Sequence, residues 1–141
     1  MAELTANDVH LALVGERVDL IWVDFRITLA FSNRSMVSFE TPFVIRDVDG
    51  TTVSVDPEDK SSLLPALNLH TQNVRRARID GSAFEMTFVS GTTLRAEPDN
   101  DYESWHYSGP EKPPVRATAL GGGELFISIP VDGRTEKAEP S

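Results

Sequence analysis

The stretch VDLIWVDFRITLAFSNRSMVSFE, residues 18–40, decides the fold, because its pattern returns at residues 74–97 as VRRARIDGSAFEMTFVSGTTLRAE. In each copy, two turns divide the chain into three segments in which apolar and polar residues alternate. This is typical of a three-stranded antiparallel meander with one buried face. We therefore predict an internal repeat at about 17–40 and 73–97, with chance similarity between two amphipathic hairpins as the alternative. The paired positions, at an offset of 56 before the first turn and 57 after it, are Val18 and Val74, Val23 and Ile79, Asp24 and Asp80, Ile27 and Phe84, Leu29 and Met86, Phe31 and Phe88, Val37 and Leu94, and Glu40 and Glu97.

Turn signals and short apolar runs extend the β pattern beyond this repeat. Gly50, Gly81 and Gly91 stand where a tight hairpin needs a positive φ. The predicted class is mainly β (α+β): two repeated antiparallel β-meanders plus a C-terminal hairpin, forming a pseudo-symmetric sheet or a small sandwich. The expected strands are residues 17–23, 26–31, 35–40, 43–47, 51–55, 73–79, 83–89, 92–97, 104–108, 115–119 and 124–129.

The segment DPEDKSSLLPALNLH, residues 56–70, predicts a short, Pro-kinked helical link between the two meanders. Asp56 is a candidate N-cap, and Pro57 fits the first helical position. Pro65 lacks a backbone donor, so it should kink the helix or split it into one or two turns on either side. The expected apolar face consists of Leu63, Leu64 and Leu67.

The length of 141 residues fits a single domain, which at this size buries roughly two thirds of the surface of its unfolded chain. We expect the domain at residues 9–130, a frayed N-terminus at 1–8 and a flexible tail at 131–141, because both ends are polar and lack periodicity. The N-terminus has no signal-peptide pattern, and no apolar run approaches the roughly 20 residues of a membrane span. Without cysteine, disulfides and thiolate zinc sites are excluded, and we expect a cytoplasmic location.

The charge balance restricts the class of partner. The chain has 22 acidic and 13 basic residues, for a formal net charge of −9. Such a chain repels phosphate backbones and anionic lipids, so we expect neither a nucleic acid nor a membrane as partner. Arg76 and Arg78 share a strand face, which we interpret as solvated. A protein partner, in particular a basic one, fits the charge.

The sequence contains no recognisable motif for catalysis or cofactor binding. His10, His70 and His106 lie far apart and lack ligand spacing, so we predict no metal site. The alternating acids from Asp99 resemble a calcium loop, but Ser104 stands where that loop needs glycine. We expect no cofactor. The sequence gives no support for an enzymatic activity, but it does not exclude one.

The stretch DYESWHYSGP, residues 101–110, is either a structural corner or a binding site. In the first interpretation, Tyr102 or Trp105 closes one end of the core, with its polar atom hydrogen-bonded. In the second, a cleft near Trp105, His106 and Tyr107 binds or hydrolyses a small molecule. The candidate binding residues are Tyr102, Trp105, His106 and Tyr107.

The two copies of the repeat differ on one strand face. Leu20 and Trp22 lie on the face that carries arginines in the second copy. The arginines indicate that this face of the second copy is exposed to solvent. The fold therefore does not itself bury this face, and a feature specific to the first copy must cover Leu20 and Trp22. The candidates are the helical link and a second copy of the chain, because Trp is enriched at interface hot spots. A homodimer is therefore one expectation.

A closing pattern follows the second meander. It consists of Tyr102, Glu103, Trp105, Gly109, Gly122, Gly123, Glu124 and Leu125. With the two meanders and the Pro-containing link, this pattern resembles a family of small bacterial domains of unknown function, over roughly Gly15 to Ile127. The link EKPPVRATAL, residues 111–120, is longer than the family pattern. The resemblance implies no activity.

Together these features favour a non-catalytic protein-binding module, of immunity or regulatory type by analogy with other small, acidic, β-rich bacterial proteins. The alternative is the small-molecule binder or hydrolase with a cleft near residues 105–107.

Overall fold

Twelve strands, one short α-helix and two 3-10 turns form within residues 4–131 and 134–137, the part of the chain that this computed structural model describes. The elements are η1 (Ala6–Asp8), β1 (Val18–Val23), β2 (Ile27–Phe31), β3 (Met36–Phe39), β4 (Phe43–Arg46), β5 (Thr52–Val55), η2 (Lys60–Ser62), α1 (Leu64–Leu67), β6 (Val74–Asp80), β7 (Ala83–Phe88), β8 (Thr93–Ala96), β9 (Trp105–Ser108), β10 (Arg116–Ala119), β11 (Leu125–Val131) and β12 (Arg134–Lys137). This confirms the predicted mainly-β class. Each of the eleven predicted strands forms, with both ends within two residues of the expected ones.

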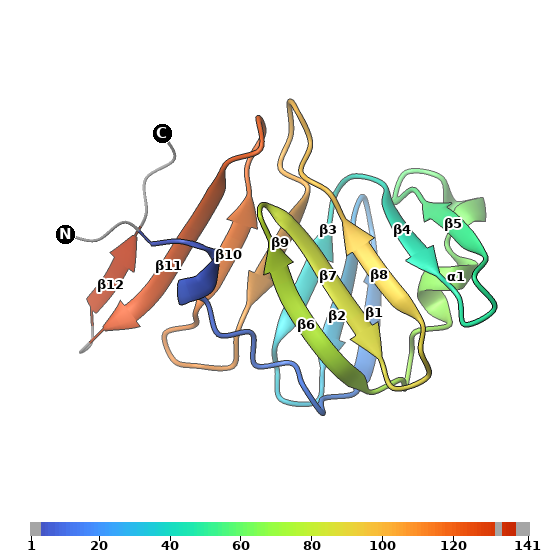
Figure 1. Cartoon of the computed structure of the whole chain (residues 1–141), viewed down its shortest axis with the longest axis horizontal. Helices are drawn as coiled ribbons and strands as arrows, with labels where there is room; N and C mark the ends of the chain where they lie inside the picture. Colours follow the sequence, from blue (N-terminus) through green and yellow to red (C-terminus); the bar gives the residue numbers. More distant parts are fainter. Residues whose placement is uncertain (1–3, 132–133, 138–141) are drawn as a thin grey trace.

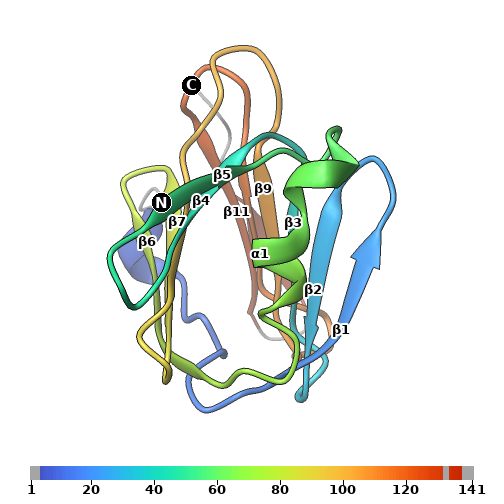
Figure 2. The same cartoon turned by 90° about the vertical axis from the view of Figure 1, so that its right-hand side faces the viewer.

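The strands form two antiparallel sheets that face each other (Figure 1). One sheet has seven strands in the order β1-β2-β3-β9-β10-β11-β12, and the other has five in the order β5-β4-β8-β7-β6. Figure 2 shows the two layers edge-on, with α1 between them at one side. Because side chains alternate along a strand, every second residue points into the space between the layers. The result is one apolar core, to which both sheets contribute.

The two predicted meanders are β1-β2-β3 and β6-β7-β8, and they lie in different sheets. Each has a register shift at the corresponding place, between Val18 and Leu20 in one and between Val74 and Arg76 in the other. The bulge at the same point of both meanders is a similarity between them in addition to the paired residues of the sequence. Origin of the two halves from one duplicated unit stays a prediction.

The helical link is divided, as predicted, but at a different residue. Its first turn is η2, where the Asp59 side chain accepts from the backbone N–H of Ser61 at 3.1 Å, so the N-cap is Asp59 and the choice of Asp56 was wrong. Pro65 lies in the first turn of α1, where no backbone donor is needed. No helix within the described residues is long and apolar enough to span a membrane.

The buried face of the link also differs from the expected one. Leu63, Ala66 and Leu69, spaced by three, are buried. Leu64 and Leu67 are exposed, which corrects their assignment to the apolar face. The correction follows from the position of the break, because a helix that starts after Leu63 presents a different side to the core.

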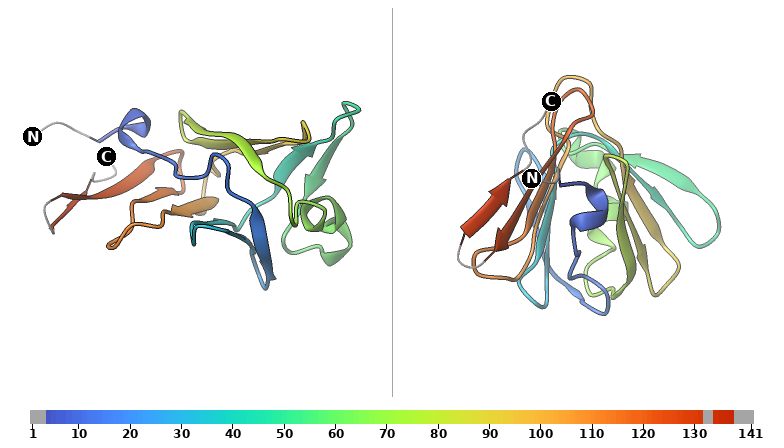
Figure 3. Two further views of the ribbon diagram at one scale, coloured as in Figure 1. Left: turned by 90° about the horizontal axis from the view of Figure 1, so that it is seen from below. Right: turned by 60° about the vertical axis from the view of Figure 1, so that its left-hand side comes forward.

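The N-terminal segment is part of the core layer. Residues 1–3 of the predicted frayed terminus lie outside the described residues, but Leu4 packs against the core and residues 6–8 form η1. Figure 3 shows this segment continuing the five-stranded layer past β6, over the C-terminal strands. Leu11 and Leu13 are buried there. A short apolar segment thus covers strands that the smaller sheet does not reach.

The predicted flexible tail contains strand structure. β11 runs to Val131, and Arg134–Lys137 pairs with it as the edge strand β12. The remainder of that tail, residues 132–133 and 138–141, lies outside the described residues. The sequence did not indicate β12 because an edge strand needs only backbone partners, not an apolar face.

Trp105 joins the two sheets at the corner that the sequence predicted. It is fully buried, and its Nε1 donates to the carbonyl oxygen of Ser82 at 2.9 Å, in the turn between β6 and β7. Its ring centroid lies 5.4 Å from that of Phe84 in the opposite sheet. The corner interpretation is therefore confirmed for Trp105. Of the two residues proposed for this role, Tyr102 does not fill it, since it is 71% exposed.

Tyr107 fixes the N-terminal segment from inside the core. Its hydroxyl oxygen accepts a hydrogen bond from the backbone N–H of Ala12 at 2.9 Å. Burial raises the pKa of the Tyr107 hydroxyl, although this hydrogen bond acts in the opposite direction. The neutral hydroxyl is thus a structural group that satisfies a backbone donor of the covering segment.

We expect Trp105→Ala to lower the free energy of unfolding by about 3 to 5 kcal/mol, as large-to-small substitutions in cores do. Tyr102→Ala is the matched control, because its exposed ring should contribute about 0.5 kcal/mol or less. Urea denaturation followed by circular dichroism measures both. Equal stability of Trp105→Ala and the parent would show that the corner does not depend on this side chain.

Candidate functional site

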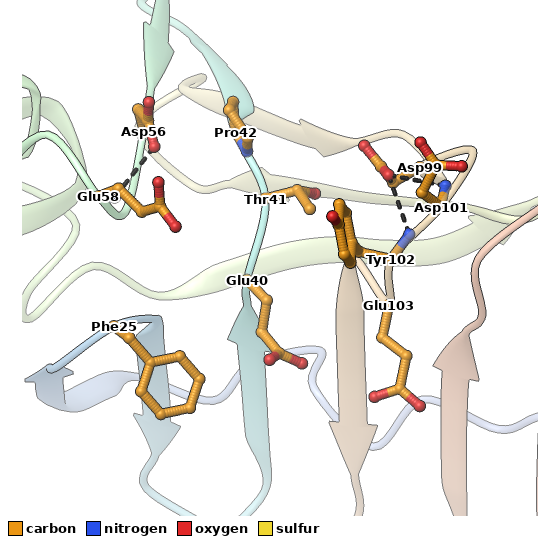
Figure 4. Close-up of a pocket in the computed structure, with 10 residues that line it drawn as sticks. All are labelled: Phe25, Glu40, Thr41, Pro42, Asp56, Glu58, Asp99, Asp101, Tyr102 and Glu103. Atoms are coloured by element: carbon orange, nitrogen blue, oxygen red, sulfur yellow. Dashed lines mark hydrogen bonds between the residues drawn. The ribbon is translucent and has the colours of Figure 1, made fainter.

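A cleft of about 880 Å³ opens at one end of the sandwich. Four connections form it: the β1–β2 turn, the crossover from β3 to β4, the link after β5 and the β8–β9 loop. Figure 4 shows its lining side chains, which come from both sheets. They are Phe25, Glu40, Thr41, Pro42, Asp56, Glu58, Asp99, Asp101, Tyr102 and Glu103.

Carboxylates dominate this acidic cleft. Six of the lining residues are acidic, and none of the described residues that line it is Lys or Arg. Lys60 and Arg26 lie close by, and both already have contacts within the chain. Lys60 Nζ donates to the carbonyl oxygens of Asp24 and Pro57, and the Arg26 guanidinium lies 4.8 Å from the ring centroid of Phe25. The lining therefore concentrates negative charge beyond the average of an already acidic chain.

Local hydrogen bonds hold the β8–β9 loop, which supplies three of these acids. The Asp99 carboxylate accepts from the backbone N–H groups of Asp101 at 2.9 Å and Tyr102 at 3.0 Å. The loop also packs against the β10–β11 turn, where a Cβ on Gly121 would lie 2.5 Å from the carbonyl oxygen of Asp101. Gly122 N–H donates to the Asp99 carbonyl oxygen at 2.9 Å. Gly121, which the closing pattern did not include, therefore has a physical role, since a side chain there would displace the loop.

Two aromatic rings stand in the acidic cleft. Phe25 is 61% exposed and Tyr102 is 71% exposed. Thr41 and Pro42 lie between the acidic groups of the two sides (Figure 4). Exposed rings beside carboxylates are a surface for cations that carry an apolar stem, because the ring face attracts positive charge.

A second cluster adjoins the cleft on the outer face of the seven-stranded sheet. His106 Nε2 contacts the Glu40 carboxylate directly and lies 3.7 Å from Glu103 Oε2. One ligand atom from each of the three residues lies within 4.8 Å of the other two. His106 Nδ1 lies 3.3 Å from Thr118 Oγ1 on the neighbouring strand. These three side chains could hold a metal ion.

The four binding residues predicted from residues 101–110 do not form one surface. Trp105 and Tyr107 point into the core and are buried, whereas His106 points to the opposite side of β9 and is half-buried. Alternation along the strand separates them. Tyr102 alone lies in the cleft. Glu40 and the acids of the β5 link were missed, because residues far apart in sequence meet only once the sheets are assembled.

The self-association residues Leu20 and Trp22 are 45% and 48% exposed on the edge strand β1. The helical link does not bury them, since Leu64 and Leu67 are themselves exposed. The suggestion that the link covers this face was therefore wrong. An apolar pair on an edge strand remains open to solvent in the single chain.

The predicted solvated face of β6 carries an ion-pair network. Arg78 Nε lies 2.9 Å from Glu85 Oε1, and Arg95 Nη1 lies 2.9 Å from Glu85 Oε2. Burial is the largest single influence on the pKa of Glu85 and would raise it, but the two arginines together lower the pKa. Glu85 therefore stays ionised, and part of the positive charge on this face is neutralised.

Comparison with known proteins agrees with the resemblance seen in the sequence. No curated protein and no solved structure matches the chain. The model of a family of unknown function, DUF6188, matches residues 9–127, which include strands β1 to β10, the acidic cleft and the His106 cluster. The chain therefore belongs to the DUF6188 family of unknown function.

Proposed function

We propose that this domain is a non-catalytic protein-binding module whose acidic cleft accepts a basic segment of its partner. The observation that carries the proposal is the convergence of six carboxylates from three connections without a Lys or Arg among the described lining residues. Like charges in water repel by about 1 kcal/mol at 4 Å, so this grouping of carboxylates raises the free energy of the unbound domain. A cationic partner relieves that repulsion.

The exposed rings suggest which cations fit best. Arg and Lys side chains combine a charge with an apolar stem, and they pack against Phe and Tyr while reaching nearby carboxylates. Within the chain, Arg26 already lies 4.8 Å from the centroid of Phe25. The partner's side chains would use the same kind of contact at Tyr102, whose ring is more exposed.

The alternative function, a small-molecule binder or hydrolase near residues 105–107, has less support. Two of its three residues are buried in the core. An immunity or regulatory role is compatible with binding through complementary charge, because such interfaces associate rapidly and select against acidic competitors. The expected cytoplasmic location stays a prediction, which cell fractionation would test.

Neutralising two cleft acids should weaken the binding of a basic peptide by roughly 3- to 30-fold, at about 0.3 to 1 kcal/mol for each exposed pair. The variant is Glu58→Gln with Asp101→Asn, two residues whose carboxylates make no hydrogen bond to other described residues. The probe is a fluorescent peptide of alternating Arg and Gly, followed by anisotropy at low ionic strength.

The matched control is Glu16→Gln with Asp19→Asn, at the end of β1 opposite to Phe25. Both double variants change the net charge from −9 to −7. The control also removes the hydrogen bond from Ser32 Oγ to Glu16 and the ion pair of Arg17 with Asp19, so circular dichroism checks that it is folded. Affinity lost in both variants to the same extent would show attraction by net charge and would contradict a specific cleft. Proteins recovered from lysate by the parent and the control but not by the cleft variant are the partner candidates.

We also propose that β1 mediates self-association. Leu20 and Trp22 are exposed on an edge strand, and edge strands with apolar side chains favour isologous pairing. This proposal is independent of the acidic cleft.

Trp22→Arg, which introduces the residue type of the second meander, should convert a dimer into a folded monomer. Sedimentation velocity measures this, with Val48→Arg as control because Val48 is an exposed apolar residue in the β4–β5 turn. A monomeric parent, or a Trp22→Arg variant that is unfolded, would exclude this interface.

A further inference from the structure

We propose that Glu40, Glu103 and His106 bind one divalent first-row transition-metal ion at the edge of the acidic cleft. The site does not depend on the proposed binding of a basic partner. It rests on the positions of three ligand atoms, on the orientation of the imidazole and on a buried hydroxyl beside them.

The ligand atoms are already close to coordinating positions. Each of the three residues places one ligand atom within 4.8 Å of the other two, and Glu103 Oε2 is 3.7 Å from His106 Nε2. Ligands at bonds of about 2.0 to 2.2 Å lie roughly 3 to 3.5 Å from one another. Glu103 is the most exposed of the three at 52% of its side chain, so it can close the remaining distance by a rotamer change.

The backbone under the cluster is fixed by hydrogen bonds. His106 lies opposite Ser38 in the β3–β9 pair, and Glu40 follows two residues later on the same face. The Glu40 N–H donates to the Ser104 carbonyl oxygen at 2.8 Å, which continues the ladder to the cleft. His106 therefore lies on β9 and Glu40 directly follows the paired strand β3, which fixes the backbone of two of the three ligands, as preorganised metal sites require.

The imidazole is oriented for coordination through Nε2. Nδ1 lies 3.3 Å from Thr118 Oγ1, and donation from Nδ1–H to this hydroxyl leaves the Nε2 lone pair facing the carboxylates. In the structure, Nε2 contacts Glu40 instead. A metal ion would lie between these two groups, bound by Nε2 and by a carboxylate oxygen of Glu40.

Ser104 supplies an independent observation. Its hydroxyl is fully buried and has no hydrogen-bond partner among the described residues. Ser104 lies directly before β9, next to Glu103 in the chain, and its carbonyl oxygen accepts from the Glu40 N–H, so its backbone adjoins two of the three ligands. A buried hydroxyl without a partner is uncommon and calls for an explanation such as a bound ion or water. A water molecule on the metal ion would give it one.

The ligand set selects the kind of ion. One imidazole and two carboxylates suit Zn²⁺, Mn²⁺, Fe²⁺ or Co²⁺, whereas Mg²⁺ and Ca²⁺ prefer oxygen alone. Three protein ligands leave coordination positions open, so the ion would also contact water or a partner group. The histidine is the feature that separates this site from general attraction of cations to the acidic cleft.

The test is isothermal titration calorimetry of the chelator-treated full chain with ZnCl₂. We expect one Zn²⁺ per chain, and a more than tenfold weaker affinity for His106→Ala and for Glu103→Gln, since even outer-shell changes cost 10- to 100-fold. His10→Ala is the matched control, because His10 is exposed and distant in sequence from the cluster, and it should bind as the parent does.

Circular dichroism establishes whether each variant is folded. If His106→Ala is unfolded, the Zn²⁺ affinity of Glu103→Gln still tests the proposal. Equal Zn²⁺ affinity in the parent and in the folded cluster variants would overturn the proposal. So would CaCl₂ binding as tight as ZnCl₂ binding, because it would assign the affinity to the carboxylates of the cleft without the histidine.

Discussion

The burial of Trp105 is the interaction on which the rest of the structure depends. The residue belongs to the seven-stranded sheet, yet its indole packs against Phe84 of the other sheet and donates to the Ser82 carbonyl oxygen. The same turn reaches further, since Ser82 Oγ donates to the carbonyl oxygen of Gly123 at 2.6 Å. The two meanders, which lie in different sheets, are thus joined at one corner, and the β8–β9 loop that enters this corner is held in place.

The acidic cleft and the His106 cluster are consequences of that corner. Glu103 and Ser104 directly precede Trp105, so the loop acids face the crossover residue Glu40 across a fixed backbone. Mutual repulsion of carboxylates opposes such a grouping, and the apolar core supplies the free energy that holds it. A site built in this way is preformed, which favours recognition of a cation or a basic segment without a folding step.

The sequence predicted the strands because their periodicity is local. It predicted burial of Trp105 because large aromatic side chains are mostly buried in folded proteins. It could not predict which strands pair across the crossover, so the contact of His106 with Glu40, 66 residues away, was missed. Tyr102 stayed both an alternative to Trp105 in the core and a candidate binding residue, because aromatic content alone does not distinguish the two. β12 was missed because backbone pairing at an edge leaves no apolar signal.

Native-state amide hydrogen exchange at Glu40 and Ser104 tests most directly whether the corner is a rigid platform. These two amides donate to the carbonyl oxygens of Ser104 and Ala119, at 2.8 and 3.1 Å. If the core anchors the corner, they exchange only through global unfolding, with a free energy equal to that from urea denaturation. Exchange through local opening, at a free energy several kcal/mol lower, would show that the loop and its acids are not held by Trp105 and would contradict a preformed site.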